Sequence, residues 1–290
     1  MNDFRVLCKV LRCPNCNDKR LILIKNYYFC DICHSKFRIK NEIINFLPKQ
    51  LTKASQIQSR YFSNEVKYTK IYSKNIFFQS RAFLSVKENI IPSIKGKNPK
   101  ILEIGCGPFA FSRYYKNINN KCEIFVCDLN ETILQASKYY DDYGKIDHRF
   151  ILDALNLPFK DNTFDYVVGI SFLHHISHIE NAMKEVLRVT KKGGYYLGIL
   201  EPFGPKLSGK IRSSLIPWLR NEQFEFVRPY DFYSDLFMKN VKKCNLKIIK
   251  GVKYQRSSAK IMYFYYLFQK LLPSAIIKQL GGNLMISLQK

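Results

Sequence analysis

Two pairs of cysteines near the amino end of the chain could hold a metal ion. Cys13 and Cys16 form one Cys-x-x-Cys pair, and Cys30 and Cys33 form a second after a hairpin-like segment. Two tight turns that each present two thiolates suit the tetrahedral coordination of zinc. Because four thiolates leave no open position on the metal, the pattern predicts a structural zinc site rather than a catalytic one.

Other chemistries of these cysteines are two disulfides or a redox-active Cys-x-x-Cys. A reducing compartment would disfavour disulfides, and a single redox pair would not explain why the motif occurs twice. His34, which directly follows Cys33, is an alternative ligand in place of one thiolate. An exposed imidazole is the simpler interpretation of His34.

Glycines and acids farther along the chain mark a ligand site. Residues 100–104 form a mainly apolar run that ends at Gly105 and Gly107, where glycine lets the backbone turn and approach a ligand. Asp128 and Asp153 end the next two apolar runs. A carboxylate about 20 residues beyond such a loop can accept hydrogen bonds from ribose hydroxyls, so the spacing predicts an adenosine cofactor. A dinucleotide also fits, because Ala110 stands at the third position of its looser fingerprint.

Several motifs occur in the same order as in one enzyme family. They are Leu102-Glu103-Ile104-Gly105-Cys106-Gly107, Asp128, Asp153-Ala154-Leu155-Asn156-Leu157-Pro158-Phe159, Phe164-Asp165-Tyr166-Val167-Val168, Leu173-His174-His175-Ile176 and the run from Glu185 to Gly194. With these motifs, residues 101–198 resemble the class I S-adenosylmethionine-dependent methyltransferases, especially the small-acceptor group related to quinone-biosynthesis methyltransferases. The resemblance favours S-adenosylmethionine over a dinucleotide, because Glu103 and Asp153 have no role in a dehydrogenase.

The resemblance implies roles for individual residues. Glu103 and the glycine loop would face the methionine part of the cofactor, and Asp128 would bind the ribose hydroxyls. Asp153 would bind the adenine amino group, and the backbone amide of Ala154 would bond to the adenine ring. The implied cofactor-binding residues are Glu103, Gly105, Cys106, Gly107, Asp128, Leu129, Asp153, Ala154 and Ser171.

Two histidines are candidates for a catalytic role. Methyl transfer from a sulfonium is an in-line displacement, so catalysis rests mainly on positioning the acceptor, although some acceptors must also lose a proton. His174 and His175 follow the fourth predicted strand of the cofactor domain, and an imidazole can act as a base near neutral pH. Packing at the start of a helix is the alternative role of this segment.

The elements that position these residues indicate an α/β fold. The resemblance implies a Rossmann-like, doubly wound mixed sheet of seven strands, preceded by a small zinc ribbon. The predicted parts are the ribbon in residues 1–48, a linker and N-terminal helices in residues 49–98, and the methyltransferase domain in residues 99–290, with an acceptor-site insertion in residues 202–230. As a separate unit, the ribbon would unfold on metal loss and leave the cofactor domain folded.

The acceptor has three interpretations. The leading prediction is a small-molecule, lipid-linked or glycan acceptor. The alternative is ribosomal or transfer RNA, because residues 37–48 resemble the end of the ribbon that precedes a bacterial ribosomal-RNA guanine methyltransferase, where the ribbon recognises RNA. A non-catalytic scaffold that binds the cofactor is the third interpretation.

Positive charge is concentrated outside the cofactor region. The net charge is +14 for residues 1–100, −3 for residues 101–190 and +13 for residues 191–290, which together give the +24 of the whole chain. Residues 236–290 contain eleven Lys or Arg and no acid. This distribution favours an anionic partner such as RNA or peripheral contact with an anionic membrane. A compositional bias toward lysine is the alternative explanation.

The sequence predicts a cytoplasmic protein without a transmembrane segment. Residues 1–10 alternate charged and apolar residues and lack the apolar core of a secretory signal. The longest apolar run, residues 261–268, is well short of the roughly 20 residues that a membrane-spanning helix needs.

Overall fold

The computed structural model describes most of the chain. The described residues are 4–48, 51, 55–56, 59, 81–204, 228–239, 241–249, 271–280 and 282–290. The insertion predicted at residues 202–230 lies largely outside them, because residues 205–227 are not described. Among the residues that are described, no helix combines the length and the apolar character needed to cross a membrane.

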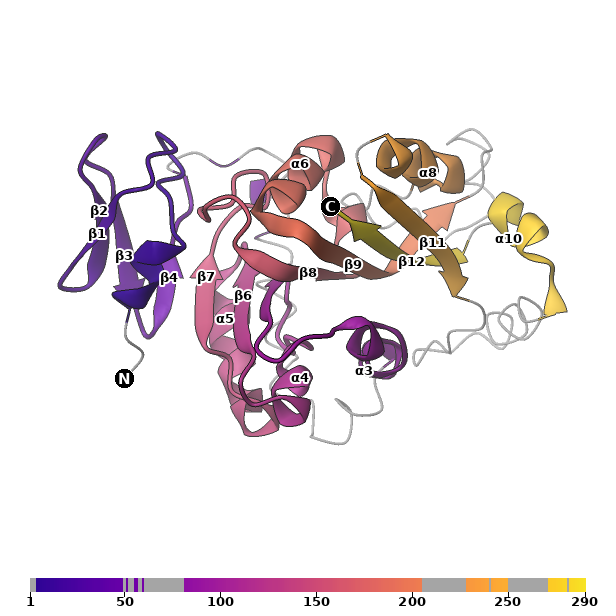
Figure 1. Ribbon diagram of the computed structural model, residues 1–290, viewed down its shortest axis with the longest axis horizontal. Helices are drawn as coiled ribbons and strands as arrows, with labels where there is room; N and C mark the ends of the chain where they lie inside the picture. The colour runs from indigo at the N-terminus through magenta and orange to yellow at the C-terminus, as the bar shows by residue number, and fades with distance from the viewer. Residues whose placement is uncertain are drawn as a thin grey trace.

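A mixed β-sheet forms the centre of the molecule (Figure 1). Its strands are β1 (Leu21–Ile24), β2 (Tyr27–Cys30), β3 (Lys36–Lys40), β4 (Ile43–Asn45), β5 (Lys100–Ile104), β6 (Glu123–Asp128), β7 (His148–Ile151), β8 (Phe164–Ile170), β9 (Thr190–Gly204), β10 (Arg228–Pro229), β11 (Lys243–Ile249) and β12 (Gly282–Gln289). The order β7-β6-β5-β8-β9-β12-β11 contains seven strands, of which β12 runs opposite to the other six. The predicted Rossmann-like mixed sheet is therefore confirmed.

The complete sheet has 12 strands rather than seven, because the ribbon adds β1 to β4 and the short strand β10 pairs with β9. Strand β4 of the ribbon pairs in parallel with β7 through Ile43, Ile44 and Asn45. The remaining ribbon strands continue outward from β4, as the left side of Figure 1 shows. The prediction of seven strands treated the ribbon and the catalytic domain separately. It could not include the pairing of β4 with β7, because these strands are about 100 residues apart in the chain.

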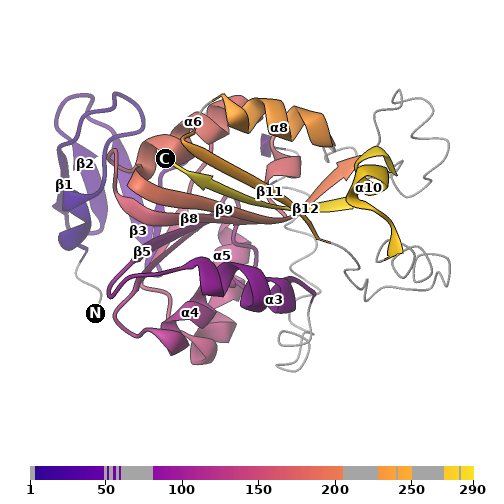
Figure 2. The same ribbon diagram turned by 45° about the vertical axis from the view of Figure 1, so that its right-hand side comes forward.

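Helices cover both faces of the sheet. They are η1 (Val6–Lys9), α3 (Arg81–Ser85), η2 (Val86–Ile90), η3 (Ile91–Ser93), α4 (Arg113–Ile118), α5 (Glu131–Ser137), η4 (Lys138–Tyr143), η5 (Leu173–His175), α6 (Ile179–Val189), α8 (Tyr230–Met238) and α10 (Ser274–Leu280). Figure 2 shows α6 and α8 on one face and α3, α4 and α5 on the other. Helix α6 buries Ile179, Met183 and Val186 at the spacing of one helical face, which explains its position against the sheet.

The ribbon shares its hydrophobic core with the catalytic part of the molecule. Phe46, which follows β4, lies with ring centroids 4.7 Å from Phe37 in the ribbon and 6.3 Å from Phe150 on β7. Leu11 is fully buried and belongs to the same cluster as Phe159. This continuity argues against a ribbon that unfolds without consequence for the rest, because metal loss would also expose apolar surface on the β7 side.

The parallel strands deliver the predicted cofactor residues to one edge. Gly105 follows β5, Asp128 ends β6, Asp153 lies two residues beyond β7, and Ser171 follows β8. Carboxyl ends of parallel strands meet at the same edge, where ligands of open α/β sheets bind.

Candidate active site

The loop after β5 adopts a conformation that favours glycine at two positions. Gly105 has φ +62° and Gly107 has φ +57°. A Cβ atom at Gly105 would lie 2.6 Å from the Phe172 ring, whereas a Cβ at Gly107 would meet nothing within 4 Å. Because Gly107 lines the cavity, its missing side chain leaves open space on the ligand side of the loop.

Asp128 joins this loop to the end of β6. Its Oδ2 accepts a hydrogen bond from the Gly107 amide at 3.2 Å, and its Oδ1 accepts one from the Asn130 amide at 3.1 Å. Burial raises the pKa of Asp128 to about 6. The carboxylate is thus oriented by the backbone and lines the cavity, where it could accept hydrogen bonds from a diol.

Asp153 lies in the turn after β7. Its Oδ1 accepts a hydrogen bond from the Leu155 amide at 3.0 Å, and its Oδ2 accepts one from the Ser55 hydroxyl at 3.0 Å. Asp153 also lines the cavity, together with Ala154 and Leu155. The two acids that the sequence singles out therefore face one space, although they belong to different strand ends.

A cavity of about 320 Å³ occupies the carboxyl edge of the sheet. The predicted cofactor residues that line it are Gly105, Cys106, Gly107, Asp128, Leu129, Asp153, Ala154 and Ser171. Glu103 is fully buried and lies outside this lining. Its carboxylate instead accepts hydrogen bonds from the Phe111 amide at 3.1 Å and the Ser112 amide at 2.7 Å, so it acts on the loop behind the cavity.

Burial raises the pKa of Glu103 to about 7, and the hydrogen bonds from the two amides counter that effect. In the structure Glu103 holds the turn that contains Phe111, a residue of the cavity wall. Its role toward the methionine part of a cofactor stays a prediction, and the geometry makes that role indirect.

Residues from the linker also reach the cavity. Ser55 bonds to Asp153, and the backbone carbonyl of Ser59 accepts a hydrogen bond from the Asn130 side chain at 2.7 Å. Both serines line the cavity, as does Phe109. The sequence gives no indication that the two serines line a cavity, because the polar residues around them are typical of a linker. Asn130 could have been found as the N-cap of α5, where its side chain accepts hydrogen bonds from the amides of Thr132 and Ile133.

The two candidate histidines have different positions. His175 lines the cavity, whereas His174 is 3% exposed and lies outside the lining. The Nδ1 of His174 lies 2.9 Å from Oε2 of Glu201, and the two imidazole centroids are 4.1 Å apart. His175 is therefore the histidine that faces the cavity, and His174 packs beside it on Glu201.

Glu201 holds the turn that carries both histidines. Its fully buried carboxylate accepts hydrogen bonds from the amides of Phe172, Leu173 and His174 at 2.7, 2.9 and 3.3 Å. Two residues beside this turn have strained backbones: Ser171, just after β8, has φ +55°, and Leu200, which precedes Glu201 within β9, has φ +61°. Four convergent donors on one carboxylate make this turn rigid.

We expect the substitution Glu201→Gln to destabilise the fold by about 1–3 kcal/mol, because a buried donor that loses its acceptor costs that much. The glutamine amide would present N–H groups toward backbone N–H groups of the turn that now donate to the carboxylate. Urea unfolding monitored by circular dichroism measures the loss. Glu180→Gln, at an exposed position in the first turn of α6, is the matched control and should cost no more than the few tenths of a kcal/mol of a surface helix-dipole interaction.

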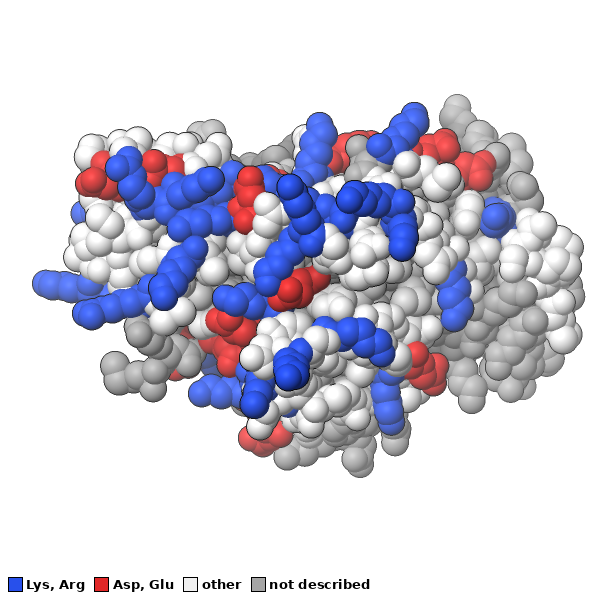
Figure 3. Space-filling model, viewed as in Figure 1, with Lys and Arg blue, Asp and Glu red and all other residues white. Residues whose placement is uncertain are grey.

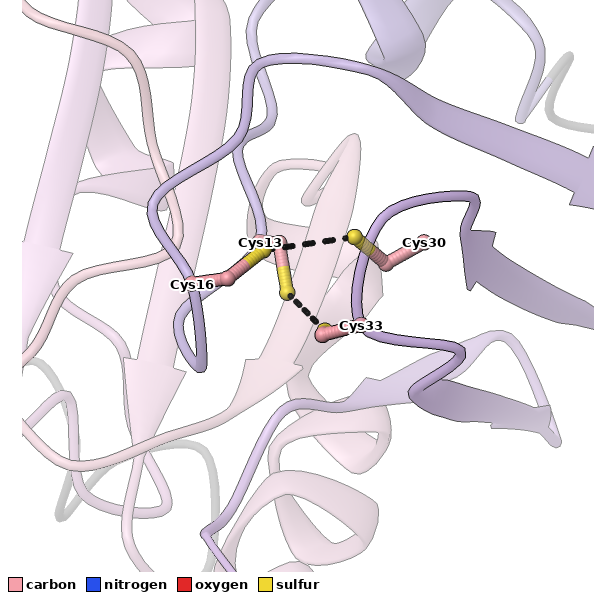
Figure 4. Close-up of side chains that lie close together, drawn as sticks. All are labelled: Cys13, Cys16, Cys30 and Cys33. Atoms are coloured by element: carbon pink, nitrogen blue, oxygen red, sulfur yellow. Dashed lines mark hydrogen bonds between the residues drawn. The ribbon is translucent and has the colours of Figure 1, made fainter.

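The four cysteines of the ribbon converge (Figure 4). Their Sγ atoms all lie within 4.8 Å of one another, with Cys13 to Cys33 and Cys16 to Cys30 each at 3.5 Å. A tetrahedral Zn–S₄ site with Zn–S bonds of about 2.3 Å requires Sγ separations of nearly this size. The donor set and spacing thus fit a four-coordinate thiolate site.

His34 belongs to the turn of the second knuckle and not to the four converging sulfurs. Its φ is +56°, and its amide donates to the Cys30 carbonyl at 2.9 Å, which closes the second knuckle. Asn17 repeats the arrangement in the first knuckle, with φ +62° and a bond to the Cys13 carbonyl at 2.9 Å. His34 lies outside the group of converging ligand atoms, so its role is in the turn.

Comparison with known proteins matches part of the chain to a family. Residues 102–198 match the family described as Methyltransferase domain. The chain is 28% identical over 160 residues to the ubiquinone/menaquinone biosynthesis C-methyltransferase UbiE of Burkholderia mallei. It is 32% identical over 100 residues to the tRNA (carboxymethyluridine(34)-5-O)-methyltransferase of Arabidopsis thaliana. The match to the Burkholderia enzyme covers 53% of this chain and 62% of that relative, and the match to the Arabidopsis enzyme covers 33% and 22%. The chain therefore spans only part of the length of these relatives.

A solved structure shows the same fold. The geranyl diphosphate C-methyltransferase of Streptomyces coelicolor superposes with a TM-score of 0.61 at 12% identity, covering 83% of this chain and 99% of that one. At this identity the likeness concerns the fold alone. Together, the matched family, the sheet order and the cavity at its carboxyl edge show that the chain contains a class I S-adenosylmethionine-dependent methyltransferase domain.

Proposed function

We propose that this protein transfers a methyl group from S-adenosylmethionine to an acceptor that enters the cavity beside His175. The observation that carries the proposal is that the predicted cofactor residues and His175 line the same cavity. Gly107, Asp128 and Asp153 line it together with His175 and Ile176. An acceptor against His175 would therefore lie next to the part of the cofactor held by the glycine loop.

The residues of the cavity fit the cofactor. The open side of Gly107 leaves room for the methionine part, Asp128 would bind the ribose hydroxyls, and Asp153 would bind the adenine amino group. When bound, S-adenosylmethionine supplies an electrophilic methyl group on a sulfonium. The protein then contributes by holding the acceptor in line with that methyl and by excluding water from the cavity.

The cavity wall favours an acceptor with an apolar part. Phe109, Ile170, Phe172 and Ile176 all line it. Apolar walls with a few polar groups are typical of sites for small molecules. A lipid-linked or apolar small molecule is therefore favoured over a glycan, in keeping with the name of the ubiquinone/menaquinone biosynthesis C-methyltransferase.

His175 is the group that we propose as acceptor-side base. Its neighbour His174 is fixed by Glu201, which holds the shared turn in place. An acceptor oxygen or nitrogen that loses a proton during transfer could give it to the His175 imidazole. His175→Asn should lower the rate of transfer and leave the affinity for the cofactor unchanged, because the carboxylates that bind the cofactor are untouched.

RNA is the second candidate acceptor. One relative is named as a tRNA methyltransferase, and Lys and Arg side chains extend over the ribbon and the adjoining catalytic part, interrupted by smaller groups of acids (Figure 3). Phosphates of RNA would displace their counterions on binding such a surface, so affinity would fall steeply with salt. The same charge would also favour peripheral contact with an anionic membrane.

The cysteine cluster is proposed to hold a structural zinc ion. Cys13, Cys16, Cys30 and Cys33 present four sulfurs at suitable distances. We propose a cytoplasmic location, where a reducing compartment would keep the four cysteines as free thiols that can bind zinc. Metal analysis of the purified protein by mass spectrometry should give about one zinc per chain.

The function is tested with methyl-labelled S-adenosylmethionine. The protein is incubated with the label and an extract of cells that lack its gene, and counts are measured in lipid, small-molecule, RNA and protein fractions. Wild type, His175→Asn and Asp128→Asn are compared. Label in the lipid or small-molecule fraction, lost in Asp128→Asn, would support the leading proposal.

Label in RNA would replace the leading acceptor by the second candidate. The transfer should then weaken as salt is raised, with a slope set by the number of phosphate contacts. Cofactor binding in calorimetry without label in any fraction would favour the non-catalytic scaffold. Absence of cofactor binding would overturn all three.

A further inference from the structure

The first cysteine knuckle of the ribbon lies against the loop that carries Asp153. We infer that the ribbon positions residues 153–157, called the cofactor loop below, through Pro14 and Arg12. Metal binding to the ribbon and cofactor binding to this loop should therefore strengthen each other. The inference rests on the proposed function in one respect, because it takes the cofactor to lie against Asp153.

Backbone pairing joins the two segments. The Arg12 amide donates to the Pro158 carbonyl at 3.0 Å, and the Lys160 amide donates to the Val10 carbonyl at 2.7 Å. Leu11 and Phe159 form an antiparallel bridge between these bonds, and both side chains are fully buried. The chain just before Cys13 and the chain just after the cofactor loop are therefore held together as a short ladder.

A side chain of the cofactor loop bonds directly to the knuckle. The Nδ2 of Asn156 donates to the Pro14 carbonyl at 2.7 Å. Pro14 lies between Cys13 and Cys16, so its carbonyl direction depends on the turn that the two ligands close. The Asn156 amide also donates to the Asp153 carbonyl at 3.1 Å, which links the knuckle to the acid in two steps.

Arg12 and Glu185 hold the next residue of the loop. The Nε of Arg12 donates to the Leu157 carbonyl at 3.3 Å, while the Leu157 amide donates to Oε2 of Glu185 at 2.8 Å. Arg12 and Glu185 form an ion pair at 3.0 Å, and both side chains are largely buried. Arg188 completes the network at 2.7 Å from Glu185. Leu157 is thus held through both its backbone groups, one of them by the ribbon.

The strand that delivers the loop is held by the ribbon as well. Beyond the pairing of β4 with β7, the Phe46 amide donates to the Ile151 carbonyl at 2.8 Å. Ile151 is the last residue of β7 and stands two residues before Asp153. The ribbon therefore contacts both ends of the cofactor loop: β4 bonds to the strand just before it, and the first knuckle bonds to its last residues.

Contacts at both ends of the cofactor loop should couple metal binding to cofactor binding. Without its metal a Cys-x-x-Cys knuckle loses its order, and the Pro14 carbonyl and Arg12 no longer restrain the loop. If metal loss weakens cofactor binding by some factor, cofactor binding must strengthen metal binding by the same factor. A ribbon that only recognises an external partner would show no such reciprocity.

The test measures both sides of the coupling on the full-length protein with S-adenosylhomocysteine, which binds without turnover. Zinc release to a chromogenic chelator should slow several-fold when S-adenosylhomocysteine is saturating, and the zinc-depleted protein should bind it about tenfold more weakly by calorimetry. Asn156→Ala should lower the affinity several-fold with zinc content and unliganded thermal stability close to wild type, because Asn156 is exposed.

Asn117→Ala is the matched control, since the Asn117 side chain donates to the Tyr143 carbonyl at 2.6 Å on the catalytic part and away from the ribbon. It should leave both the affinity and the zinc-release rate unchanged. Equal affinity in holo and zinc-depleted protein, or a zinc-release rate that ignores S-adenosylhomocysteine, would overturn the inference and leave the proposed function standing. Holo protein that binds no S-adenosylhomocysteine would instead overturn the proposed function.

Discussion

Replacing Gly105 with alanine should weaken S-adenosylmethionine binding by about 30-fold or more, because two costs of at least about 1 kcal/mol each oppose the loop conformation that would bind the cofactor. The first is the left-handed backbone at φ +62°, which costs a residue with a Cβ about 1–2 kcal/mol. The second is steric, since the new Cβ would lie 2.6 Å from the Phe172 ring and displace a residue of the cavity wall. Calorimetric titration with S-adenosylmethionine measures the loss.

Alanine substitutions at two other glycines distinguish the cost of backbone strain from the steric cost. Gly193 has φ +79° with nothing within 4 Å of a Cβ and does not line the cavity, so Gly193→Ala should lower the free energy of unfolding by about 1–2 kcal/mol and bind the cofactor normally. Gly107→Ala combines φ +57° with a Cβ that projects into open space beside the ligand and should fall between the two. Wild-type affinity in Gly105→Ala would remove the glycine loop from the cofactor site.

The affinity for S-adenosylmethionine should fall as the pH falls through about 6, because Asp128 must be ionised to accept hydrogen bonds from the ribose. Burial raises the pKa of this carboxyl above its ordinary value, so the proton returns at a pH where exposed acids remain charged. With a pKa of about 6, binding at pH 5 should be about tenfold weaker than at pH 8.

Asp128→Asn should bind about 100-fold more weakly at pH 8 and lose this pH dependence, because hydrogen bonds to a charged group contribute about 1.5–3 kcal/mol each. Titrations at several pH values compare it with wild type and with Glu88→Gln, which changes an exposed acid and should reproduce the wild-type curve. A wild-type affinity that stays constant between pH 5 and pH 8 would show that Asp128 does not bind the cofactor as a carboxylate.

Both variants act at positions that could be predicted from the sequence. Short apolar runs that end in Gly105, Asp128 and Asp153 predicted three parallel strands and one shared edge, and the structure places these residues around a single cavity. The signal is strong because a buried parallel strand must be apolar along its length and its ligand-facing residues must come just after it. The two Cys-x-x-Cys pairs were equally informative, since each knuckle is local in sequence.

Other features were beyond such reasoning because they depend on contacts between distant segments. Whether His174 or His175 faces the cavity was decided by Glu201, a residue 27 positions beyond His174 that bonds to its imidazole. The position of Glu103 behind the cavity wall was decided by the Phe111 and Ser112 amides, which turn back over its carboxylate.

What the sequence by itself determined is the chemistry that is local: glycines that turn, acids that follow strands and cysteine pairs that can share a metal. What only the tertiary structure decided is how the ribbon joins the catalytic part. Pairing of β4 with β7 and the bond from Asn156 to Pro14 link segments more than 100 residues apart. The physical reason is that an exposed strand edge can accept any strand of suitable register, and burial of Leu11, Phe46 and Phe159 in one core selects this partner.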